Sequence, residues 1–425
     1  MTPSGARTPT LLLRAVLAVE QIAPALPRWL AARGHRRQGA DPARFRERLG
    51  RATLQRPEGR LLWVHAASVG EVVAVRDLAR DLAAEAGAAL LVTTATQGGA
   101  GAVPKEALHQ FAPIDTASAV AGFLDHWRPD LGVFVEADLW PRLVLEASRR
   151  GVPLALVNAR ASRTRARLPR SMGALLSPFA LVTAQDEPVA RELKGLGVGR
   201  VEAVGDLRAS AEPPGADPET LATLEEAIGE RPVWAAVSTH PGDEAAVLEA
   251  HLRARSRPLG LLLLWAPRHP TRGDDILWAV RKAGLRTARR SLGEEPSAAT
   301  DVLLFDTLGE TGLVFRLAPL TFLGGSFGPE GGHNPWEPAA LESAVLSGPN
   351  VANHRGSFAR LVRGGAARIV DDGAGLGAAV AALLGTAELD AMREAGRRAA
   401  AEGGGARART LELLRPLLAG GRRGA

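Results

Sequence analysis

A glycine-rich segment between an apolar run and a predicted helix is the part of this sequence best suited to bind an anion. Residues 324–338 read GGSFGPEGGHNPWEP and follow the apolar run 317–323, which predicts a buried strand. The five glycines would let backbone N–H groups approach a phosphate closely. Asn334 could cap a helix opened by Pro335, and Glu337 could accept a ribose hydroxyl. The segment predicts a nucleotide-binding turn, although an ordinary capped strand-to-helix turn fits the same residues.

A carboxylate near the start of the first predicted helical pattern could act as a general base. Glu71 closes the segment HAASVGE at residues 65–71, which follows an apolar run. At a helix start it could accept the proton of an attacking hydroxyl. The spacing Ser68-x-x-Glu71 also fits a capping box, so helix initiation explains this glutamate equally well.

Charged side chains also follow two later apolar runs in the first half of the chain. Glu136 and Asp138 lie in VEADLWP, and strand alternation predicts that both point to one side. Either acid could instead cap a helix that starts near Pro141. Arg208 ends the segment VGDLR, where its guanidinium could stabilise a leaving phosphate or form an interdomain salt bridge.

The second half has three more loops that place polar residues after an apolar run. Two of them contain His240 and the pair Arg268 and His269. No His/Asp/Glu spacing supports a metal site, and Arg268 would repel a cation, so contact with a phosphate or a base is the better interpretation. The candidate ligand loops are STHPGDE at 238–244, PRHP at 267–270 and DTLGE at 306–310.

Length and composition place the chain among folded two-domain proteins. It has 425 residues, of which 46% are hydrophobic and 23% charged, and this is too long for one core. Cysteine is absent, which excludes disulfides, zinc-thiolate sites and a thiol nucleophile, and fits a reducing compartment.

Positive charge is concentrated at the N-terminus. Residues 1–60 hold 12 arginines and 4 acids, although the whole chain carries only +6. The apolar stretch 11–23 is too short and too interrupted to cross a bilayer, so we expect an interfacial helix followed by arginines that meet anionic lipid. A signal peptide or a helix packed on the protein body are the alternatives. Nucleic acid is a poor candidate partner, because the basic segment lacks interleaved aromatics and no nucleic-acid-binding motif is visible.

Short apolar runs alternate with longer helical patterns beyond residue 60, which predicts parallel α/β layers. We expect an α/β protein with two doubly wound, Rossmann-like domains facing across a cleft, with ligands at the carboxyl ends of both sheets. The expected parts are a membrane-associating segment 1–40, a first Rossmann-like domain 41–210, a linker 211–224 and a second Rossmann-like domain 225–425. The strand candidates are 61–65, 89–93, 131–135, 154–158, 181–184 and 201–204, then 233–237, 260–266, 302–305, 317–323, 344–347 and 367–370.

Taken together, these motifs resemble the 3-deoxy-D-manno-octulosonic acid (Kdo) transferases of lipopolysaccharide assembly. The resemblance implies a GT-B glycosyltransferase fold, CMP-Kdo as the donor, lipid IVA as the acceptor and no cofactor. It implies that domain 41–210 binds the acceptor and that domain 225–425 binds CMP-Kdo. It also implies that the N-terminal segment anchors the enzyme, peripherally or by insertion, to the cytoplasmic side of the inner membrane. The segments that carry the resemblance are 65–71, 136–141, 158–160, 238–240, 267–269 and 331–338.

The resemblance also implies roles for individual residues. The family's catalytic base falls on Glu71 and its second acid on Glu136. CMP contacts fall on Arg268, His269, Leu308, Gly309, Glu310, Asn334, Pro335, Trp336 and Glu337. The sequence departs from the family at Arg208, where a lysine is usual, at Asp206, where Asn or Ser is common, and at 97–99, where a Pro-Thr-Gly pattern is usual.

The expected reaction is an inverting, metal-independent transfer in which Glu71 deprotonates the acceptor hydroxyl and Arg208 steadies the departing CMP phosphate. One alternative is a GT-B transferase or nucleotide-sugar epimerase with another donor or acceptor. The other is a non-catalytic protein that binds a nucleotide or a lipid surface.

Overall fold

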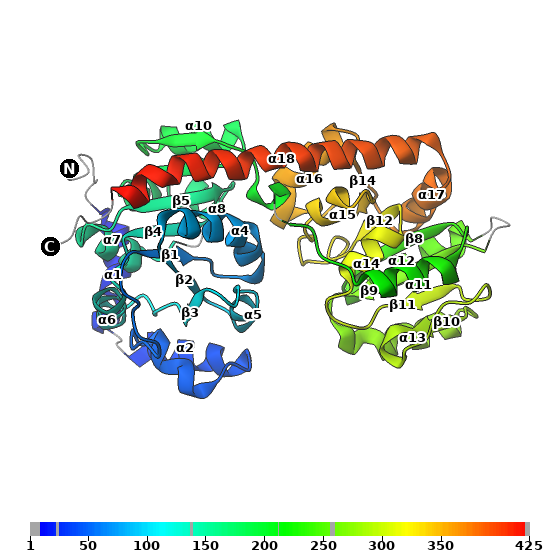
Figure 1. The fold of residues 1–425 in the computed structure, drawn as a ribbon, viewed down its shortest axis with the longest axis horizontal. Helices are drawn as coiled ribbons and strands as arrows, with labels where there is room; N and C mark the ends of the chain where they lie inside the picture. The colour runs from blue at the N-terminus through cyan, green and yellow to red at the C-terminus, as the bar shows by residue number, and fades with distance from the viewer. Residues whose placement is uncertain (1–8, 23–24, 137–138, 211, 256–259, 421–425) are drawn as a thin grey trace. The chain divides into compact units, whose positions relative to one another are not determined.

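The computed structural model describes residues 9–22, 25–136, 139–210, 212–255 and 260–420. It divides into two compact units: unit 1 is Met1–Ala211 with Gly403–Ala425, and unit 2 is Glu212–Glu402. Each unit contains one seven-stranded sheet whose strand pairs are all parallel (Figure 1). The α/β class and the two-sheet organisation expected from the sequence are therefore confirmed.

The sheet of unit 1 has the strand order β3-β2-β1-β4-β5-β6-β7. Its central strands are short runs of Leu, Val and Phe that are buried along their whole length, as expected for a sheet covered on both faces. The strands are β1 Leu61–His65, β2 Ala89–Thr94, β3 Leu108–Phe111, β4 Leu131–Val135, β5 Leu154–Ala159, β6 Leu181–Ala184 and β7 Val201–Ala203.

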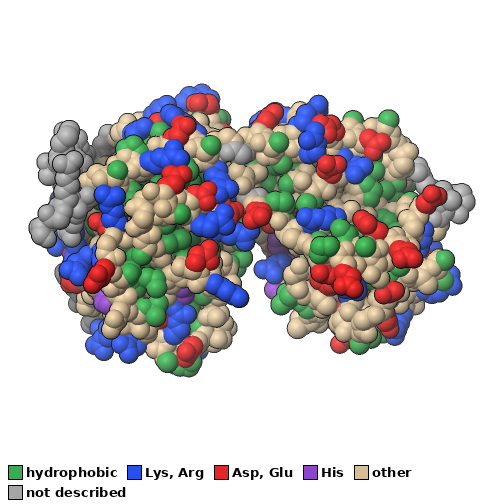
Figure 2. Space-filling view, in the orientation of Figure 1, with side chains coloured by type: hydrophobic (Ala, Val, Ile, Leu, Met, Phe, Trp, Pro, Cys, Tyr) green, Lys and Arg blue, Asp and Glu red, His purple; other side chains and the backbone are tan. Residues whose placement is uncertain are grey.

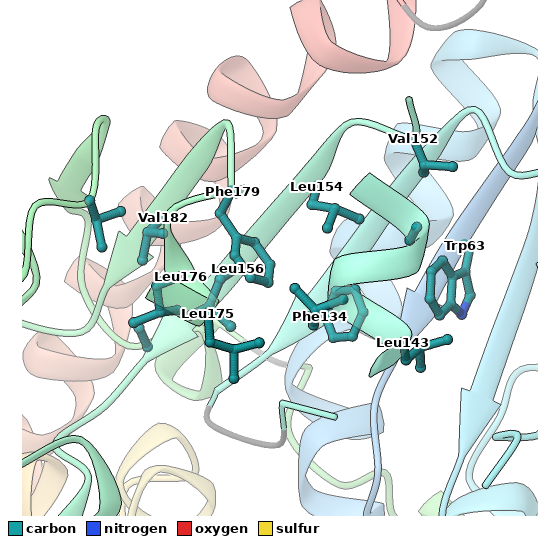
Figure 3. Close-up of a cluster of buried hydrophobic side chains, with 14 of the residues drawn as sticks. Trp63, Phe134, Leu143, Val152, Leu154, Leu156, Leu175, Leu176, Phe179 and Val182 are labelled. Carbon is teal, nitrogen blue, oxygen red and sulfur yellow. The ribbon is translucent and has the colours of Figure 1, made fainter. Parts of the chain in front are cut away.

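Alternation along β1 sends side chains to two separate cores. Leu61 and Trp63 join one cluster, and Leu62 and Val64 join the other. The first cluster packs against α6, α7, α9 and α10, and Figure 3 shows Trp63 and Phe134 within it. The helices of unit 1 are α1 Leu11–Ile22, α2 Ala25–Arg37, α3 Phe45–Arg48, α4 Val69–Ala86, α5 Gln97–Gly101, α6 Ala117–Trp127, α7 Pro141–Arg149, α8 Arg163–Arg167, α9 Pro169–Leu176 and α10 Glu187–Gly195, with 3₁₀ turns η1 Pro42–Arg44 and η2 Leu207–Ser210.

The second core of unit 1 is covered by α4 and by the end of the last helix, α18 Ala387–Ala419. Leu411, Leu414 and Leu418 of α18 are buried in this core. The chain end therefore belongs to unit 1 from Gly403 on, whereas the sequence placed everything after residue 225 in the second domain. Leu389 and Met392 of α18 are buried in the core of unit 2, whereas the later leucines of the same helix are buried in unit 1.

The sheet of unit 2 has the order β10-β11-β9-β8-β12-β13-β14. Its strands are β8 Val233–Thr239, β9 Leu262–Pro267, β10 Thr287–Arg289, β11 Val302–Leu304, β12 Leu320–Leu323, β13 Ala344–Ser347 and β14 Ala367–Ile369. Its helices are α11 Pro218–Ile228, α12 Pro241–Ala254, α13 Gly273–Lys282, α14 Thr311–Leu317, α15 Trp336–Ala340, α16 Arg355–Arg363 and α17 Gly373–Leu383, with 3₁₀ turns η3 Pro270–Arg272, η4 Arg290–Leu292 and η5 Ala352–His354.

Close helix packing supports one face of the unit 2 sheet. A Cβ added to Gly373 would lie 2.8 Å from the Cα of Ala246, and one added to Gly377 would lie 3.0 Å from the carbonyl oxygen of Ala250. These two glycines let α17 approach α12 closely, and both helices bury apolar residues in the core below. This packing fixes α12, whose first turn carries residues of the candidate site.

Three details of unit 2 and of the sheet edges differ from the sequence expectations. Part of the expected linker is helical, because Asp217 caps α11 by accepting the N–H of Thr220 at 2.8 Å. The expected strand 317–323 begins only at Leu320, after Pro319. Strands β3 and β10 were not predicted. Both are edge strands of three or four residues with polar side chains, so they lack the apolar run of a buried strand.

Among the described ranges, no single helix is long and apolar enough to span a bilayer, and only the strongly bent pair α17 and α18 reaches that length and composition together. Basic and acidic side chains are interspersed on the visible face of each unit (Figure 2). Nearly all the basic ones are arginines, and many of these pair with nearby carboxylates.

Candidate active site

Strands β1 and β4 lie side by side at the centre of the unit 1 sheet, and the chain leaves them toward opposite edges. The carboxyl ends of two such strands form the topological switch point, where open α/β sheets bind ligands. Glu71 lies in the first turn of the helix after β1, and Glu136 directly follows β4. The two acids singled out in the sequence therefore flank this switch point.

Glu71 is almost fully buried, and its Oε2 accepts the backbone N–H of Ala67 at 2.6 Å. The expected capping box does not form as the sequence suggested, because Ser68 occupies the N-cap position without a side-chain capping bond. The Glu71 carboxylate holds the residue before the N-cap instead. Glu71 therefore fixes the loop that leaves β1, and the capping interpretation does not account for its geometry.

Glu136 is buried and lies between two guanidinium groups. Its Oε2 accepts the Nε–H of Arg160 at 2.8 Å, and its Oε1 pairs with Arg208. The backbone φ of Glu136 is 60°, a left-handed conformation that costs of the order of 1–3 kcal/mol for a residue other than glycine. The two ion pairs hold this strained residue in place. Asp138 lies outside the described residues.

Arg208, in η2 beyond β7, is surrounded by three acids. Burial alone would lower the pKa of Arg208, but the carboxylates of Glu136, Asp206 and Glu71 outweigh burial and raise that pKa above its ordinary value. Arg208 is therefore a permanent cation beside Glu71. We call Glu71, Glu136, Arg160 and Arg208 the acid–arginine cluster.

Asp206 and Asn158 position the backbone around Arg208 through hydrogen bonds. The Asp206 Oδ1 accepts the N–H of Arg208 at 3.0 Å and the Nδ2–H of Asn158 at 3.2 Å. Asn158 in turn accepts the N–H of Leu207 at 2.9 Å through Oδ1. These bonds tie the end of β5 to η2, and Asp206 thereby positions the arginine after it.

In unit 2, three neighbouring strands, β9, β8 and β12, carry a second polar group at their carboxyl ends. His240 follows β8, and its Nε2 lies 3.0 Å from the Nε2 of His333 in the glycine-rich loop, with the two rings stacked 5.2 Å apart. His269, after β9, meets His240 edge-on with 5.7 Å between ring centroids. We call His240, His269 and His333, together with Arg268, the histidine cluster.

Two imidazoles of the histidine cluster, those of His269 and His333, have lowered pKa values beside Arg268. Burial, with His240 and Arg268 nearby, lowers the pKa of His333 to about 4. Burial, then Arg268 and His240, also lower the pKa of His269. At neutral pH the cluster can thus donate ring N–H groups to an anion while Arg268, which is exposed, supplies the charge. In the part of the chain that is described, no group of three or more His, Asp or Glu side chains is arranged to hold a metal ion.

The turn 308–310 follows β11, the next strand beyond β9 in the sheet. Leu308 and Gly309 are exposed, and Leu308 retains 80% of its accessible surface. The side chain of Glu310 pairs with Arg290 at 2.7 Å and accepts the hydroxyl of Thr307. The structure therefore places this turn on the same edge of the sheet as Arg268 and His269, with Glu310 engaged by its own neighbours.

The end of the glycine-rich loop forms a short turn before α15. Asn334 donates from Nδ2 to the Oε1 of Glu337 at 3.1 Å, and its Oδ1 accepts the N–H of Trp336 at 3.2 Å. Pro335 is the N-cap of α15 and Trp336 is its first residue, one position later than the sequence suggested. Trp336 is buried beneath the guanidinium of Arg360, 5.6 Å from its ring, so it packs in the protein.

Comparison with known proteins identifies the family. A family model described as 3-deoxy-D-manno-octulosonic-acid transferase (kdotransferase) matches residues 43–211. The 3-deoxy-D-manno-octulosonic acid transferase of Haemophilus influenzae is 31% identical over 88% of this chain and 92% of that protein. The chain belongs to the Kdo transferase family. The Bordetella pertussis member is 35% identical over 94% of this chain and 97% of its own length.

Solved structures place this Kdo transferase family member in the GT-B fold. A glycosyltransferase from Rickettsia africae aligns with a TM-score of 0.58 at 13% identity, over 85% of this chain and 99% of that one. The calicheamicin glycosyltransferase CalG4 gives 0.53 at 14% identity, with the same coverage. Both likenesses concern the fold, and they confirm the fold class expected from the sequence.

Arg160 and His333 of this Kdo transferase family member were missing from the expected site, and His240 was expected only as a candidate phosphate or base contact. Arg160 lies in the motif 158–160, but only the structure shows its bond to Glu136. His240 and His333 also lie in segments that carried the family resemblance, yet 93 positions separate them in the chain. The signal available in the sequence was that each residue follows a strand. That position does not show which side chains of other loops the residue contacts.

Proposed function

We propose that this chain transfers Kdo from CMP-Kdo to lipid IVA, with inversion at the anomeric carbon and without a metal. The observation that carries the proposal is the burial of Glu71 beside Arg208 at the switch point of unit 1, in a member of the Kdo transferase family. A carboxylate and a permanent cation in one buried cluster are the two groups that such a displacement needs.

The proposed reaction uses Glu71 as the general base. Its carboxylate takes the proton of an acceptor sugar hydroxyl, the hydroxyl oxygen forms a bond to the anomeric carbon of Kdo, and the bond from that carbon to the CMP phosphate breaks. The departing phosphate carries the electron pair away, and Arg208 offsets its charge. Glu136, paired with both Arg208 and Arg160, holds the guanidinium in position and takes no part in proton transfer.

The histidine cluster of unit 2 is the proposed donor site. Arg268 and the ring N–H groups of His240 and His269 would contact the CMP phosphate. Asn334 and Glu337, already joined by a hydrogen bond, would face the ribose hydroxyls. The exposed turn at Leu308 and Gly309 would contact the base, as the family resemblance implies.

We also propose that the N-terminal helices lie on the anionic cytoplasmic face of the inner membrane. Leu11 of α1 is 83% exposed, and Trp29 and Leu30 of α2 are each 53% exposed. Arg33 stacks over Trp29 at 5.5 Å, which places a cation beside an aromatic ring suited to the membrane interface. A double variant Trp29→Ser and Leu30→Ser should lose co-flotation with phosphatidylglycerol vesicles, and unchanged flotation would refute this surface.

The transfer itself can be tested by incubating the full chain with CMP-Kdo and lipid IVA. The proposal predicts CMP release and a lipid product heavier by whole Kdo units in the mass spectrum. CMP, but not UDP, should raise the melting temperature of the protein, because binding to the folded state stabilises it by mass action. Stabilisation by UDP alone, or release of CMP without a heavier lipid, would refute the proposed reaction.

A further inference from the structure

One buried carboxylate joins the two loops of unit 2 that carry His240 and His333. Asp243, in the first turn of α12, has no exposed surface. Its Oδ2 accepts the N–H of His240 at 2.8 Å and of Gly325 at 2.6 Å. Its Oδ1 accepts the N–H of Phe327 at 3.0 Å and of Ser326 at 3.3 Å. Four backbone donors from two loops thus converge on one side chain.

Part of the glycine-rich loop uses its backbone N–H groups to bind a carboxylate inside the protein. A buried carboxylate is costly unless hydrogen bonds satisfy it, and here the bonds come from three consecutive residues, 325–327. Those three N–H groups point at Asp243, so they are not presented to a ligand phosphate. Over residues 325–327, the anion site expected from the sequence is therefore occupied by the carboxylate of Asp243.

The anchored part of the loop leads directly to the candidate donor residues. Gly332 donates its N–H to the carbonyl of Gly325 at 2.7 Å, which closes the loop onto its anchored end. The next residue is His333, whose Nε2 meets that of His240 at 3.0 Å. The same Oδ2 of Asp243 accepts the N–H groups of Gly325 and His240, so Asp243 links the two segments that carry the histidines.

We propose that Asp243 is the positioning residue of the donor site. It holds the glycine-rich loop in the one conformation that brings His333, Asn334 and Glu337 to the nucleotide, and it leaves recognition of the phosphate to the histidine cluster. The identity of the nucleotide, CMP, rests on the proposed function. The role of Asp243 in ordering the loop does not.

The test compares Asp243→Asn with a matched control in the same unit. Asparagine keeps the size of the side chain but loses the charge and turns an amide N–H toward backbone donors. Asp372→Asn is the control, because Asp372 also accepts a backbone N–H at a helix start, that of Gly375 at 2.7 Å, and it follows β14 at the edge of the sheet. For each protein we would measure amide hydrogen exchange at 325–327, CMP affinity by calorimetry, and kcat and KM for CMP-Kdo.

Asp243→Asn should speed exchange at 325–327 by about tenfold or more and weaken CMP binding by about tenfold, the cost of losing charge-assisted bonds. KM for the donor should rise more than kcat falls, since the chemical step uses Glu71. Asp372→Asn should leave CMP affinity and KM unchanged. A merely structural Asp243 would lower the melting temperature without moving KM or CMP affinity, and that outcome would overturn the proposal.

Two further comparisons apply if Asp243→Asn does not fold or if the wild-type protein binds no CMP. If Asp243→Asn does not fold by circular dichroism, Asp243→Glu retains the charge on a longer arm and should fold with faster exchange at 325–327 and weaker CMP binding. Wild-type exchange and affinity in that variant would contradict the proposal. If the wild-type protein binds no CMP, the proposed donor is wrong, and the exchange rates alone still decide whether Asp243 orders the loop.

Discussion

The Nε of Arg160 donates to the Oε2 of Glu136 at 2.8 Å, on the opposite carboxylate oxygen from the one that pairs with Arg208. The two arginines are not equivalent, because the side chain of Arg208 is 11% exposed and that of Arg160 is 38% exposed. A buried guanidinium depends on its partner far more than an exposed one does. Glu136 is therefore best understood as the anchor of Arg208.

Because the two arginines differ in burial, breaking their ion pairs with Glu136 should lower the free energy of unfolding by different amounts. Glu136→Gln leaves the buried Arg208 without its closest carboxylate and should lower the free energy of unfolding by roughly 3 kcal/mol. Arg160→Gln removes the partly exposed partner and should cost less than about 1 kcal/mol. Urea denaturation followed by circular dichroism measures both. Equal losses in the two variants would contradict the anchoring role of Glu136.

The family resemblance implied a lysine at the position that Arg208 occupies, so charge and shape can be tested separately there. If the positive charge is what stabilises the leaving phosphate, Arg208→Lys should keep kcat within about tenfold of wild type. Arg208→Gln should lower kcat by about 10²–10³-fold, the usual loss for one electrostatic stabiliser. Steady-state kinetics with CMP-Kdo decides the matter. A lysine variant as inactive as the glutamine variant would show that the guanidinium fork is required.

Gly324 lets the glycine-rich loop leave β12 directly against the end of β8. A Cβ on Gly324 would lie 2.5 Å from the Cα of Thr239 and 2.7 Å from the carbonyl oxygen of Ser238. Gly324→Ala should therefore destabilise the protein by about 2–3 kcal/mol and weaken CMP binding as the loop is displaced. The control is Gly293→Ala, where φ is 71° but the added Cβ meets open space, so only about 1 kcal/mol is expected. Similar melting temperatures for the two variants would refute this close approach.

The stability of the folded protein should also fall in mild acid, because the unfolded chain takes up a proton on His251 more readily than the folded protein does. Trp234 donates its indole N–H to the Nδ1 of the fully buried His251 at 3.2 Å, and burial lowers the pKa of His251 to about 4 from an ordinary 6.5. The unfolded chain takes up the proton first as the pH falls. The stability contributed by neutral His251 is therefore full above about pH 6.5 and is lost toward pH 4, by up to about 3 kcal/mol.

The matched variant for this pH effect is His251→Gln, which cannot titrate. Its melting temperature at pH 7.5 should be below that of the wild type, and the gap should shrink as the pH is lowered to 5. His109 and His333, whose pKa values burial also lowers to about 4, remain in both proteins and do not affect the comparison. A gap that stays constant with pH would mean that His251 does not titrate in this range.

The sequence was sufficient for most inner strands of the two sheets and for the strand ends that carry the site. The runs 61–65, 131–135, 181–184 and 344–347 coincide with β1, β4, β6 and β13, because central strands buried on both faces are continuous apolar runs. The pattern also predicted that Glu71 and Glu136 follow strands of one sheet, and the structure makes those two strands, β1 and β4, neighbours. The positions of these strands and of their ends follow from the local apolar pattern and from the fold class, and both can be recognised in a single sequence.

The parts that could not be predicted depend on contacts between segments far apart in the chain. Asp243 reads as a first-turn acid of a helix, and nothing near it indicates that residues 325–327 donate to it. The approach of His240 to His333 likewise requires two loops to fold together. The glycine-rich loop suggested a phosphate cradle because the same backbone N–H groups suit either an external anion or an internal carboxylate.

The central claim, that Glu71 is the base of a Kdo transfer, is tested most directly by the rate of CMP release from CMP-Kdo and lipid IVA with wild type and Glu71→Gln. We predict that kcat falls by about 10²–10⁴-fold in the variant. CMP affinity and the circular dichroism spectrum should stay unchanged, since the amide oxygen can still accept the N–H of Ala67. Retained turnover per folded molecule in a destabilised variant would contradict it and leave Glu71 as a residue that only holds the loop after β1.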